Sequence, residues 1–472
     1  MQQLKPILFL ISLLFTTIHV DATEYPASMV SGTIPVIYIN TEDNQEIVDK
    51  TTQIAAGFYM DPETSGYPVI GTEDNPVDLT IRGRGNWTWL QVKKPYKLKF
   101  SEKVSLCGLP KSKHYALLAH IVYTSHVWAD NEMAYEMSRI MGMPWAPHTV
   151  PVELVLNGEY MGVYFLSETV RIEKNRLNIF EQEDGETDPD IIPYGWLVEI
   201  DNSAADIKIP ENENLTLYFT FHTPEELSPQ QKDYITNELQ TITEIIYDPN
   251  DPDLWTEYID AKSMAQYFII REILHDSDAY AGSFFLYKDK EENAKWHVGP
   301  LWDCTNQSYD KPCYIPHWIT EYPQLRLSWI TRLILSPAFE RAVREEWKTF
   351  YKEENLQRIM NYLENYSKNL DKAFEASNLR WKDSNVQLYD RTAHLAVLRE
   401  ALYNNTQWIN SHLNINEIAR NFNESLGISD LEKEDGRAVY YTIDGHILHI
   451  KPTKPGIYIY KQGGKTEKIY IR

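Results

Sequence analysis

The stretch IRGRGNWTWLQVKKPYKLKF, residues 81–100, decides how the first part of this chain folds. It sets Gly83 and Gly85 between arginines and follows them with Asn-Trp-Thr-Trp. Glycines allow backbone N–H groups to approach an anion closely, and the side chain of Asn86 is suited to hold the turn through a local hydrogen bond. The pattern therefore fits a loop that cradles an anionic ligand.

The second half of the stretch alternates apolar and basic residues, as a strand with one buried face does. Its apolar positions are Tyr96, Leu98 and Phe100, and its basic positions are Lys97 and Lys99. If the apolar side chains face a core, the two lysines line the opposite face. Taken alone, these residues fit an exposed hairpin with solvated lysines as well as they fit an anion site.

The overall charge excludes one large class of anionic partner. The 472 residues include 68 acidic and 45 basic side chains, for a formal net charge of -23. Such a chain repels nucleic-acid phosphates and anionic membrane surfaces, so no nucleic-acid partner is expected. Against this background the six Lys and Arg residues between Arg82 and Lys99 are a local exception.

The N-terminus reads as a secretory signal. A single Lys is followed by an apolar run from about residue 6 to 18 and by a small-residue site ending at Ala22. This run is short for a membrane span, so residues 1–22 are predicted to be a cleaved signal peptide; a retained anchor is the alternative. No later segment has the length of a membrane helix, and the protein is expected to be secreted, periplasmic or at the cell surface.

Three cysteines are few for a secreted chain of this size. Cys304 and Cys313 would close a short loop in an oxidising compartment, while Cys107 would stay unpaired. Three idle thiols are an equally good interpretation. A structural zinc site is not expected, because zinc needs more ligands at closer spacing.

The order of elements predicts an α+β protein of two lobes and a small C-terminal module. Residues 23–185 read as a β-rich lobe with one helix near 125–141 and a tight turn at Asn157-Gly158. Residues 186–430 read as a mainly helical lobe, with helices near 229–246 and 261–274 and a short hairpin near 283–303. Residues 431–472 alternate with Gly turns and predict a β module. A cleft between two lobes is a favoured place for ligands.

A second group of candidate residues lies in that later lobe. Asp276, Asp278 and Asp303 stand near the ends of short apolar segments, where loops present side chains to a cleft. Phosphoryl transfer uses one carboxylate to orient the nucleophile and another to hold magnesium, and Asp278 followed by Asp303 suits that division. Capping and turn aspartates are the simpler interpretation of the same residues.

Five blocks in order make the chain recognisable: IRGRGNWTW…KKPYKLKF, VELVLNGEYMGVYFLSETV, GWLVEIDN, SFFLYKD and GPLWD. Over roughly residues 34–413 the chain resembles the CotH kinase family, secreted or spore-coat proteins with a divergent protein-kinase-like fold. It resembles the secreted branch found in Bacteroidetes. The C-terminal module resembles the sorting or secretion modules of secreted proteins from that phylum.

The resemblance implies a two-lobed protein-kinase-like fold that binds ATP with Mg or Mn. The loop facing the nucleotide would contain Arg82, Gly83, Gly85 and Asn86. Lys99, or as second choice Lys97, would neutralise the ATP phosphates.

Further roles follow from the same resemblance. Glu132 and Glu136 are the candidates for the acidic partner of that lysine. Glu168 would lie at the hinge where adenine docks. Asp278 would be the catalytic aspartate, and Asp303 the metal ligand.

Two positions depart from the expected pattern. Kinases place an Asn five residues after the catalytic Asp to hold a second metal, and Ser283 stands there in this chain. The family commonly shows a second carboxylate two residues after the metal-binding Asp, and this chain has Thr305, with Asn306 as a partial substitute.

Three functions compete on these residues. The first is a secreted atypical kinase that phosphorylates Ser or Thr of an unknown protein acceptor. The second is a catalytically impaired pseudokinase-type surface protein that binds a glycan or protein, to which 13 Trp and 31 Tyr would be suited. The third is a glycoside hydrolase with paired carboxylates, which leaves the glycine loop and its lysines unexplained.

Overall fold

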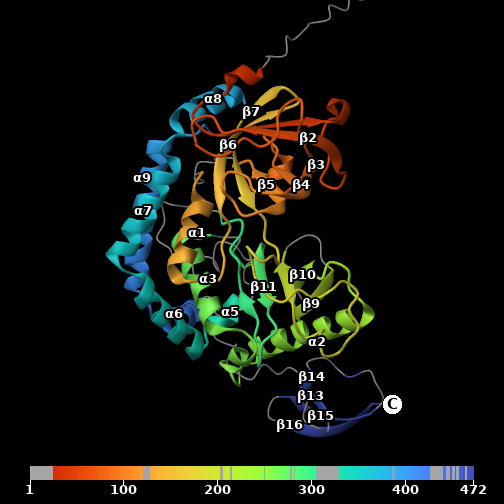
Figure 1. The fold of residues 1–472 in the computed structure, drawn as a ribbon. Coiled ribbons are helices and arrows are strands. Elements are labelled where there is room, and N and C mark those ends of the chain that lie inside the picture. Colours follow the sequence, from red (N-terminus) through yellow and green to blue (C-terminus); the bar gives the residue numbers. More distant parts are fainter. Residues whose placement is uncertain are drawn as a thin grey trace, which may run out of the picture.

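The computed structural model describes most of the chain after residue 24. The described residues are 25–120, 128–201, 206–212, 215–248, 250–276, 279–280, 282–304, 329–384, 386, 388–425, 439–442, 447–448, 452, 456–462 and 465–471. The predicted signal peptide lies outside them. Their elements mix α and β structure in three separate sheets with helices between and beside them (Figure 1).

The first sheet is a closed barrel of seven strands in the order β1-β2-β3-β4-β5-β7-β6. The strands are β1 (Val36–Thr41), β2 (Ile54–Asp61), β3 (Val77–Gly83), β4 (Tyr96–Val104), β5 (Ser112–Leu118), β6 (Thr149–Leu156) and β7 (Glu159–Glu168). The parallel pairing of β1 with β6 closes the ring, and all other neighbours are antiparallel. The predicted β-rich region is thus a barrel without open edges.

The alternation predicted for residues 96–100 is confirmed in β4. Tyr96, Leu98 and Phe100 are buried in the barrel interior, and the side chains between them lie on the outer face. The predicted tight turn also forms, because Asn157 (φ 50°) and Gly158 (φ 80°) both take the left-handed conformation that a two-residue hairpin between β6 and β7 requires.

Among the described residues of this region the one α-helix is α1 (Asp130–Met141), which ends at Gly142 in the left-handed conformation. The chain then reaches a second, five-stranded sheet in the order β12-β11-β8-β10-β9. Its strands are β8 (Trp196–Ile200), β9 (Ile207–Asn212), β10 (Leu215–Thr223), β11 (Phe284–Lys288) and β12 (His297–Val298). The predicted hairpin is confirmed as β11 paired with β12.

Helices α2 (Pro229–Ile246) and α3 (Ala261–Leu274) pack on strands of the five-stranded sheet, and together with that sheet they form what we call the second unit. Both helices begin where the sequence predicts. A capping box formed by Ser228 and Gln231 opens α2. Asp260 caps α3, since its carboxylate accepts a hydrogen bond from the Ser263 N–H at 2.7 Å.

The later helices form an arc along one side of the molecule (Figure 1). They are α5 (Ile330–Leu333), α6 (Pro337–Phe350), α7 (Glu353–Ser367), α8 (Asp371–Trp381), α9 (Arg391–Asn410) and α10 (Ile415–Ser425). At one end of the arc α8 packs on β7 of the barrel, and at the other end α6 packs on α3. Between them α7 contacts α1, while α9 contacts α3 and α7. The arc therefore ties the barrel to the second unit.

The predicted C-terminal β module is a four-stranded sheet of its own, in the order β14-β13-β15-β16. Its strands are β13 (Val439–Thr442), β14 (Ile447–Leu448), β15 (Gly456–Gln462) and β16 (Lys465–Ile471). Among the described residues, no helix is long and apolar enough to span a bilayer.

The second unit contains more strand than the sequence predicted. Only the hairpin near residues 283–303 was expected there, but β8, β9 and β10 share its sheet, and β11 pairs with β8. The predicted domain boundaries at 185/186 and 430/431 remain predictions.

Candidate functional site

The basic residues of the stretch 81–100 lie in four different environments. Arg82 on β3 lies opposite Lys97 on β4, so both side chains share the outer face of the barrel. The guanidinium of Arg82 donates to the carbonyls of Lys50 and Gly83, which anchors the start of the glycine loop.

Lys97 lies within a cluster of cations on this face. Burial lowers its pKa to about 8, and the neighbouring Arg82 and Arg171 lower it further. Burial also lowers the pKa of His114 on β5 to about 3, with Arg171 and Lys97 adding to the effect. Glu225 faces the cluster through an ion pair with Arg171 at 3.7 Å. Positive charges held together in this way favour an anionic ligand.

Lys99 has a different environment from Lys97. Its side chain is exposed and lines a shallow groove over the barrel strands, together with Gln53, Thr80 and Lys113. The structure therefore separates the two lysines that the sequence treated as alternatives.

Lys93 and Lys94 have structural roles instead. Lys93 is completely buried; its Nζ donates to the Val163 carbonyl at 2.5 Å and to the Tyr389 hydroxyl at 3.2 Å. It also lies 4.9 Å from the centre of the Tyr164 ring. Lys94 donates to the Trp89 carbonyl at 2.6 Å and lies over that indole ring. These lysines fix the end of the loop and do not point toward an open ligand site.

The glycines are required by close packing within the loop. A Cβ on Gly83 would lie 2.5 Å from the Trp89 ring and 2.7 Å from the Asp49 carbonyl. Gly85 has φ 80°, and a Cβ there would collide with the Thr88 hydroxyl. Asn86 accepts a hydrogen bond from Lys50 at 3.2 Å. The loop is thus a compact turn held from both sides.

The glycine loop contacts a segment that follows it in sequence by more than two hundred residues. The Arg84 guanidinium lies over the Trp302 ring, 5.4 Å from its centre, and Trp302 directly precedes Asp303. A cation over an indole face is attractive. The fold therefore brings together two blocks that the sequence had selected separately.

Asp303 is the exposed residue between buried Trp302 and buried Cys304. Its φ is 51°, a conformation that costs non-glycine residues about 1–2 kcal/mol. Ser283, at the start of the hairpin that leads to this segment, also has φ 51°. Strained backbone of this kind often accompanies functional positions.

A buried arginine of α3 fixes the backbone of the segment that contains Asp303. Arg271 on α3 donates to the Trp302 carbonyl at 2.8 Å and to the Asp303 carbonyl at 3.2 Å, and it forms an ion pair with the buried Asp276. Asp278 and Thr305 lie outside the described residues. Within the part of the chain that the structure describes, no cluster of three or more His, Cys, Asp or Glu side chains is arranged to hold a metal.

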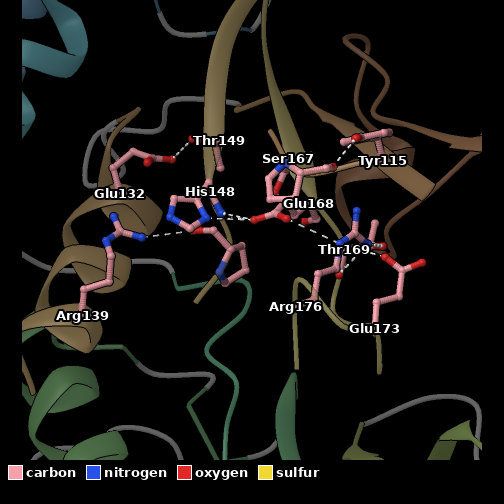
Figure 2. Close-up of polar contacts among 12 residues, drawn as sticks. Tyr115, Glu132, Arg139, His148, Thr149, Ser167, Glu168, Thr169, Glu173 and Arg176 are labelled. Carbon is pink, nitrogen blue, oxygen red and sulfur yellow. Dashed lines mark hydrogen bonds and ion pairs between the residues drawn. The ribbon is translucent and has the colours of Figure 1, made fainter. Parts of the chain in front are cut away.

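Glu168, at the end of β7, is the centre of a buried polar network (Figure 2). Its carboxylate accepts from the His148 backbone N–H at 3.0 Å and contacts the His148 ring at 2.9 Å. On its other side the Arg176 Nε lies 3.6 Å away, and Arg176 also donates to the His114 carbonyl at 2.6 Å. The Glu168 side chain is fully buried, so its carboxylate serves the protein rather than an open site.

Neither candidate glutamate on α1 is paired with Lys97 or Lys99 among the described residues. Glu132 bonds to Thr149 and to the Tyr362 hydroxyl, and burial raises its pKa. Glu136 forms ion pairs at 2.8 Å with Arg139 and with Arg358 of α7. Among the described residues the lysine–glutamate pair expected from the resemblance is therefore not formed, and α7 supplies one partner of each carboxylate, Tyr362 and Arg358.

Cys107 and Cys304 are free, buried thiols. Cys313 lies outside the described residues. Burial raises the pKa of both described thiols to about 12, which keeps them protonated and unreactive at neutral pH.

Sequence reasoning missed Arg171, His114 and Arg271. Arg171 and His114 are single residues without a motif, and only the fold brings them beside Lys97. Arg271 lies in the second half of α3, where residues 267–274 read YFIIREIL and are mostly apolar. A charged residue in a mostly apolar, buried segment was the available signal, because a buried charge requires a partner.

These features define a class: an α+β protein with a basic strand face and a glycine loop that contacts an aspartate-bearing loop of a second unit. The family model described as CotH kinase protein matches residues 81–424. The chain therefore belongs to the CotH kinase family. No curated protein matches it significantly.

Proposed function

We propose that this chain is a secreted atypical protein kinase that transfers the γ-phosphate of ATP to a Ser or Thr hydroxyl of a protein. The observation that carries the proposal is the contact of Arg84 with Trp302, since it joins the glycine loop to the loop of Asp303. Membership of the CotH kinase family supports the same activity. The predicted signal at residues 1–22 supports export.

The cationic cluster suits a polyphosphate. Lys97, Arg82 and Arg171 offer three positive charges within mutual range, and Glu225 pairs with Arg171. We assign the phosphate-binding role to Lys97 in preference to Lys99, because Lys97 is half-buried in this cluster. Lys99 is exposed on a groove of the barrel.

The Asp303 loop suits a magnesium or manganese ion that is bound together with ATP. Magnesium is commonly held by one or two carboxylates plus substrate phosphates rather than by a cage of protein ligands. A single exposed carboxylate next to Trp302, which contacts the glycine loop through Arg84, meets that need. The metal would neutralise charge on the transferred phosphoryl group.

The remaining chemistry is assigned to the protein's own side chains. Asp278 would accept the proton of the acceptor hydroxyl or orient that hydroxyl. Its neighbour Asp276 is already neutralised by Arg271, so it is not a free base. The Glu168 carboxylate is buried, so an adenine at the hinge would have to bind main-chain groups near the end of β7.

Ser283 and Thr305 favour a second candidate, a protein that binds nucleotide or a surface ligand without transferring phosphate. A serine hydroxyl is a weaker magnesium ligand than the asparagine or carboxylate oxygens that kinases use. Under this alternative the site would bind ATP, and a partner protein or glycan would bind elsewhere on the surface without being phosphorylated.

Thermal unfolding with ATP and Mg²⁺ or Mn²⁺ tests the nucleotide site. Wild-type protein is expected to be stabilised at millimolar ATP with metal, because a ligand that binds only the folded state raises its stability. Asp303→Ala should lose the part of this stabilisation that depends on the metal ion. Lys97→Ala should weaken ATP binding by about 10- to 100-fold, the loss expected for a hydrogen bond to a charged group.

Lys99→Ala is the matched control, since it removes the same charge from the same strand and should leave ATP binding within about threefold. Equal losses in Lys97→Ala and Lys99→Ala would contradict the assignment. No stabilisation of wild type by ATP would contradict the nucleotide site itself.

Incubation with radiolabelled ATP then separates transfer from binding. Wild type should label itself or an added acceptor such as casein, and Asp278→Ala should not. ATP binding without any labelling would support the second candidate.

A further inference from the structure

The backbone around Asp303 is held from two different helices. On one side Arg271 of α3 binds the carbonyls of Trp302 and Asp303. On the other side the Cys304 N–H donates to the Asn131 Oδ1 at 2.8 Å. Asp303, with φ 51°, stands between these anchors.

The contact from Asn131 is well insulated from water. Asn131 is 3% exposed and Cys304 is fully buried. Removing the acceptor of a buried N–H group destabilises the folded protein, because the group is then left without a hydrogen bond. The position of the Cys304 N–H is therefore tied to the position of Asn131.

Asn131 in turn moves with α1, because it lies in the first turn of that helix. Farther along, α1 is fastened to α7 by the ion pair of Glu136 with Arg358 at 2.8 Å and by the hydrogen bond of Glu132 with Tyr362 at 3.2 Å. A path of polar contacts thus runs from α7 through α1 to the residue after Asp303, exposed at Arg358 and buried at Asn131 and Cys304.

We propose that Asn131 is a positioning residue that sets the Asp303 carboxylate for its metal and couples it to the placement of α1. The proposal rests on the proposed function, in which Asp303 binds the metal that accompanies ATP. Asn131 acts through the backbone of Cys304 and touches neither metal nor nucleotide.

Hydrogen exchange tests the structural half of the proposal without reference to activity. In the full-length protein the Cys304 amide should be protected, and Asn131→Ala should lower its protection at least tenfold. Asn131→Asp keeps an acceptor oxygen at the same place and should restore most of the protection.

Asn405→Ala is the matched control. Asn405 is also a buried amide, and it donates to the Ile273 carbonyl in the last turn of α3 at 2.8 Å rather than to the segment of Asp303 and Cys304. Its loss should destabilise the protein to a similar degree while leaving the Cys304 amide protected. Unchanged protection in Asn131→Ala, or an equal loss in Asn405→Ala, would overturn the proposal.

Metal titration tests the functional half. The Mn²⁺ concentration that gives half of the ATP-dependent thermal stabilisation should rise about tenfold in Asn131→Ala and stay within threefold in Asn405→Ala and Asn131→Asp. ATP binding at saturating Mn²⁺ should be unchanged in all three.

Different results would contradict the proposed function and the proposed role of Asn131. If ATP with metal does not stabilise even wild type, the proposed function is wrong, while the exchange result still decides whether Asn131 holds the loop. If wild type responds and the Mn²⁺ requirement of Asn131→Ala equals that of Asn405→Ala, Asn131 does not position the metal ligand.

Discussion

At the scale of single residues, the four lysines of residues 93–99 show how burial divides one sequence pattern into separate roles. Lys93 is enclosed and Lys94 lies on Trp89. Lys97 joins the cationic cluster, and Lys99 is exposed. The same residue type thus fixes a loop at two positions and joins a cationic cluster at a third.

Lys93 gives a prediction about pH. Burial lowers its pKa to about 7, against 10.5 in the unfolded chain. Between these values the unfolded chain binds a proton that the folded protein does not, so the stability contributed by this group rises with pH above about 7. The stability of wild type relative to Lys93→Met should therefore rise by about 2 kcal/mol between pH 7 and pH 9.

Urea unfolding of both proteins at each pH measures this difference. Other titrating groups, including Lys97, contribute equally to both proteins and cancel. If the stability difference between wild type and Lys93→Met does not change between pH 7 and pH 9, the pKa of Lys93 is not lowered in the folded protein.

The sequence predicted part of this site and could not predict the rest. Alternation was enough to place the side chains of Lys97 and Lys99 outside the barrel. Choosing between them required the positions of Arg171 and Glu225, which approach β4 only through the fold. The partners of Glu132 and Glu136 on α7 were hidden for the same reason, since they lie more than two hundred residues away.

At the scale of elements, the junction of β7 with α8 is built around Gly162. This residue has φ 86° and lies where the register of β6 and β7 shifts. A Cβ there would lie 2.5 Å from the Ser377 hydroxyl and 3.1 Å from the Trp381 indole nitrogen. The Ser377 hydroxyl accepts from the Val163 N–H at 3.1 Å, so α8 replaces part of the strand pairing that the bulge interrupts.

Gly162→Ala is expected to destabilise the protein by about 2–5 kcal/mol, because it adds overpacking of about 1–3 kcal/mol to a left-handed strain of about 1–2 kcal/mol. Gly158→Ala is its control. Gly158 has a similar φ of 80°, but a Cβ there would meet no atom within 4 Å. Denaturant unfolding should give only the strain cost for Gly158→Ala; equal costs would show that α8 does not press on Gly162.

Predictability at this scale followed the strength of local signals. The Asn157-Gly158 turn and the acidic residue Asp260 that opens α3 each depend on a few adjacent residues, and both were predicted. The capping box of α2 was not predicted, although the helix itself was. Strand β9 was missed because it contains Pro210 and Asn212, residue types that are rare in strands. Strand β10 reads LTLYFTFHT, so its strand-like signal was present and was overlooked. β10 pairs with β8 on one side and with β9 on the other, which brings β9 into the sheet.

At the scale of the whole molecule, the C-terminal sheet is a separable unit. Its four strands pair with one another in a sheet distinct from the barrel and from the five-stranded sheet. The family match ends at residue 424, before that sheet begins. The folding and nucleotide binding of the preceding part are therefore expected not to depend on it.

A chain ending at residue 425 should keep its melting temperature within about 2 °C, a change that corresponds to about 2 kcal/mol for a chain of this size. Its stabilisation by ATP should also be unchanged. A chain ending at residue 413 is the control, because it loses α10 as well. Asn416 of that helix donates to the carbonyls of Ile334 and Ser336, and Ile415 and Ala419 are buried.

The shorter chain should therefore unfold at a clearly lower temperature, since it exposes an apolar face and leaves two buried carbonyls without their donor. If the chain ending at 425 melts as low as the chain ending at 413, the C-terminal sheet supports the fold that precedes it. Comparable melting of both truncated chains and wild type would instead show that α10 adds little, and would place the end of the stable unit at α9.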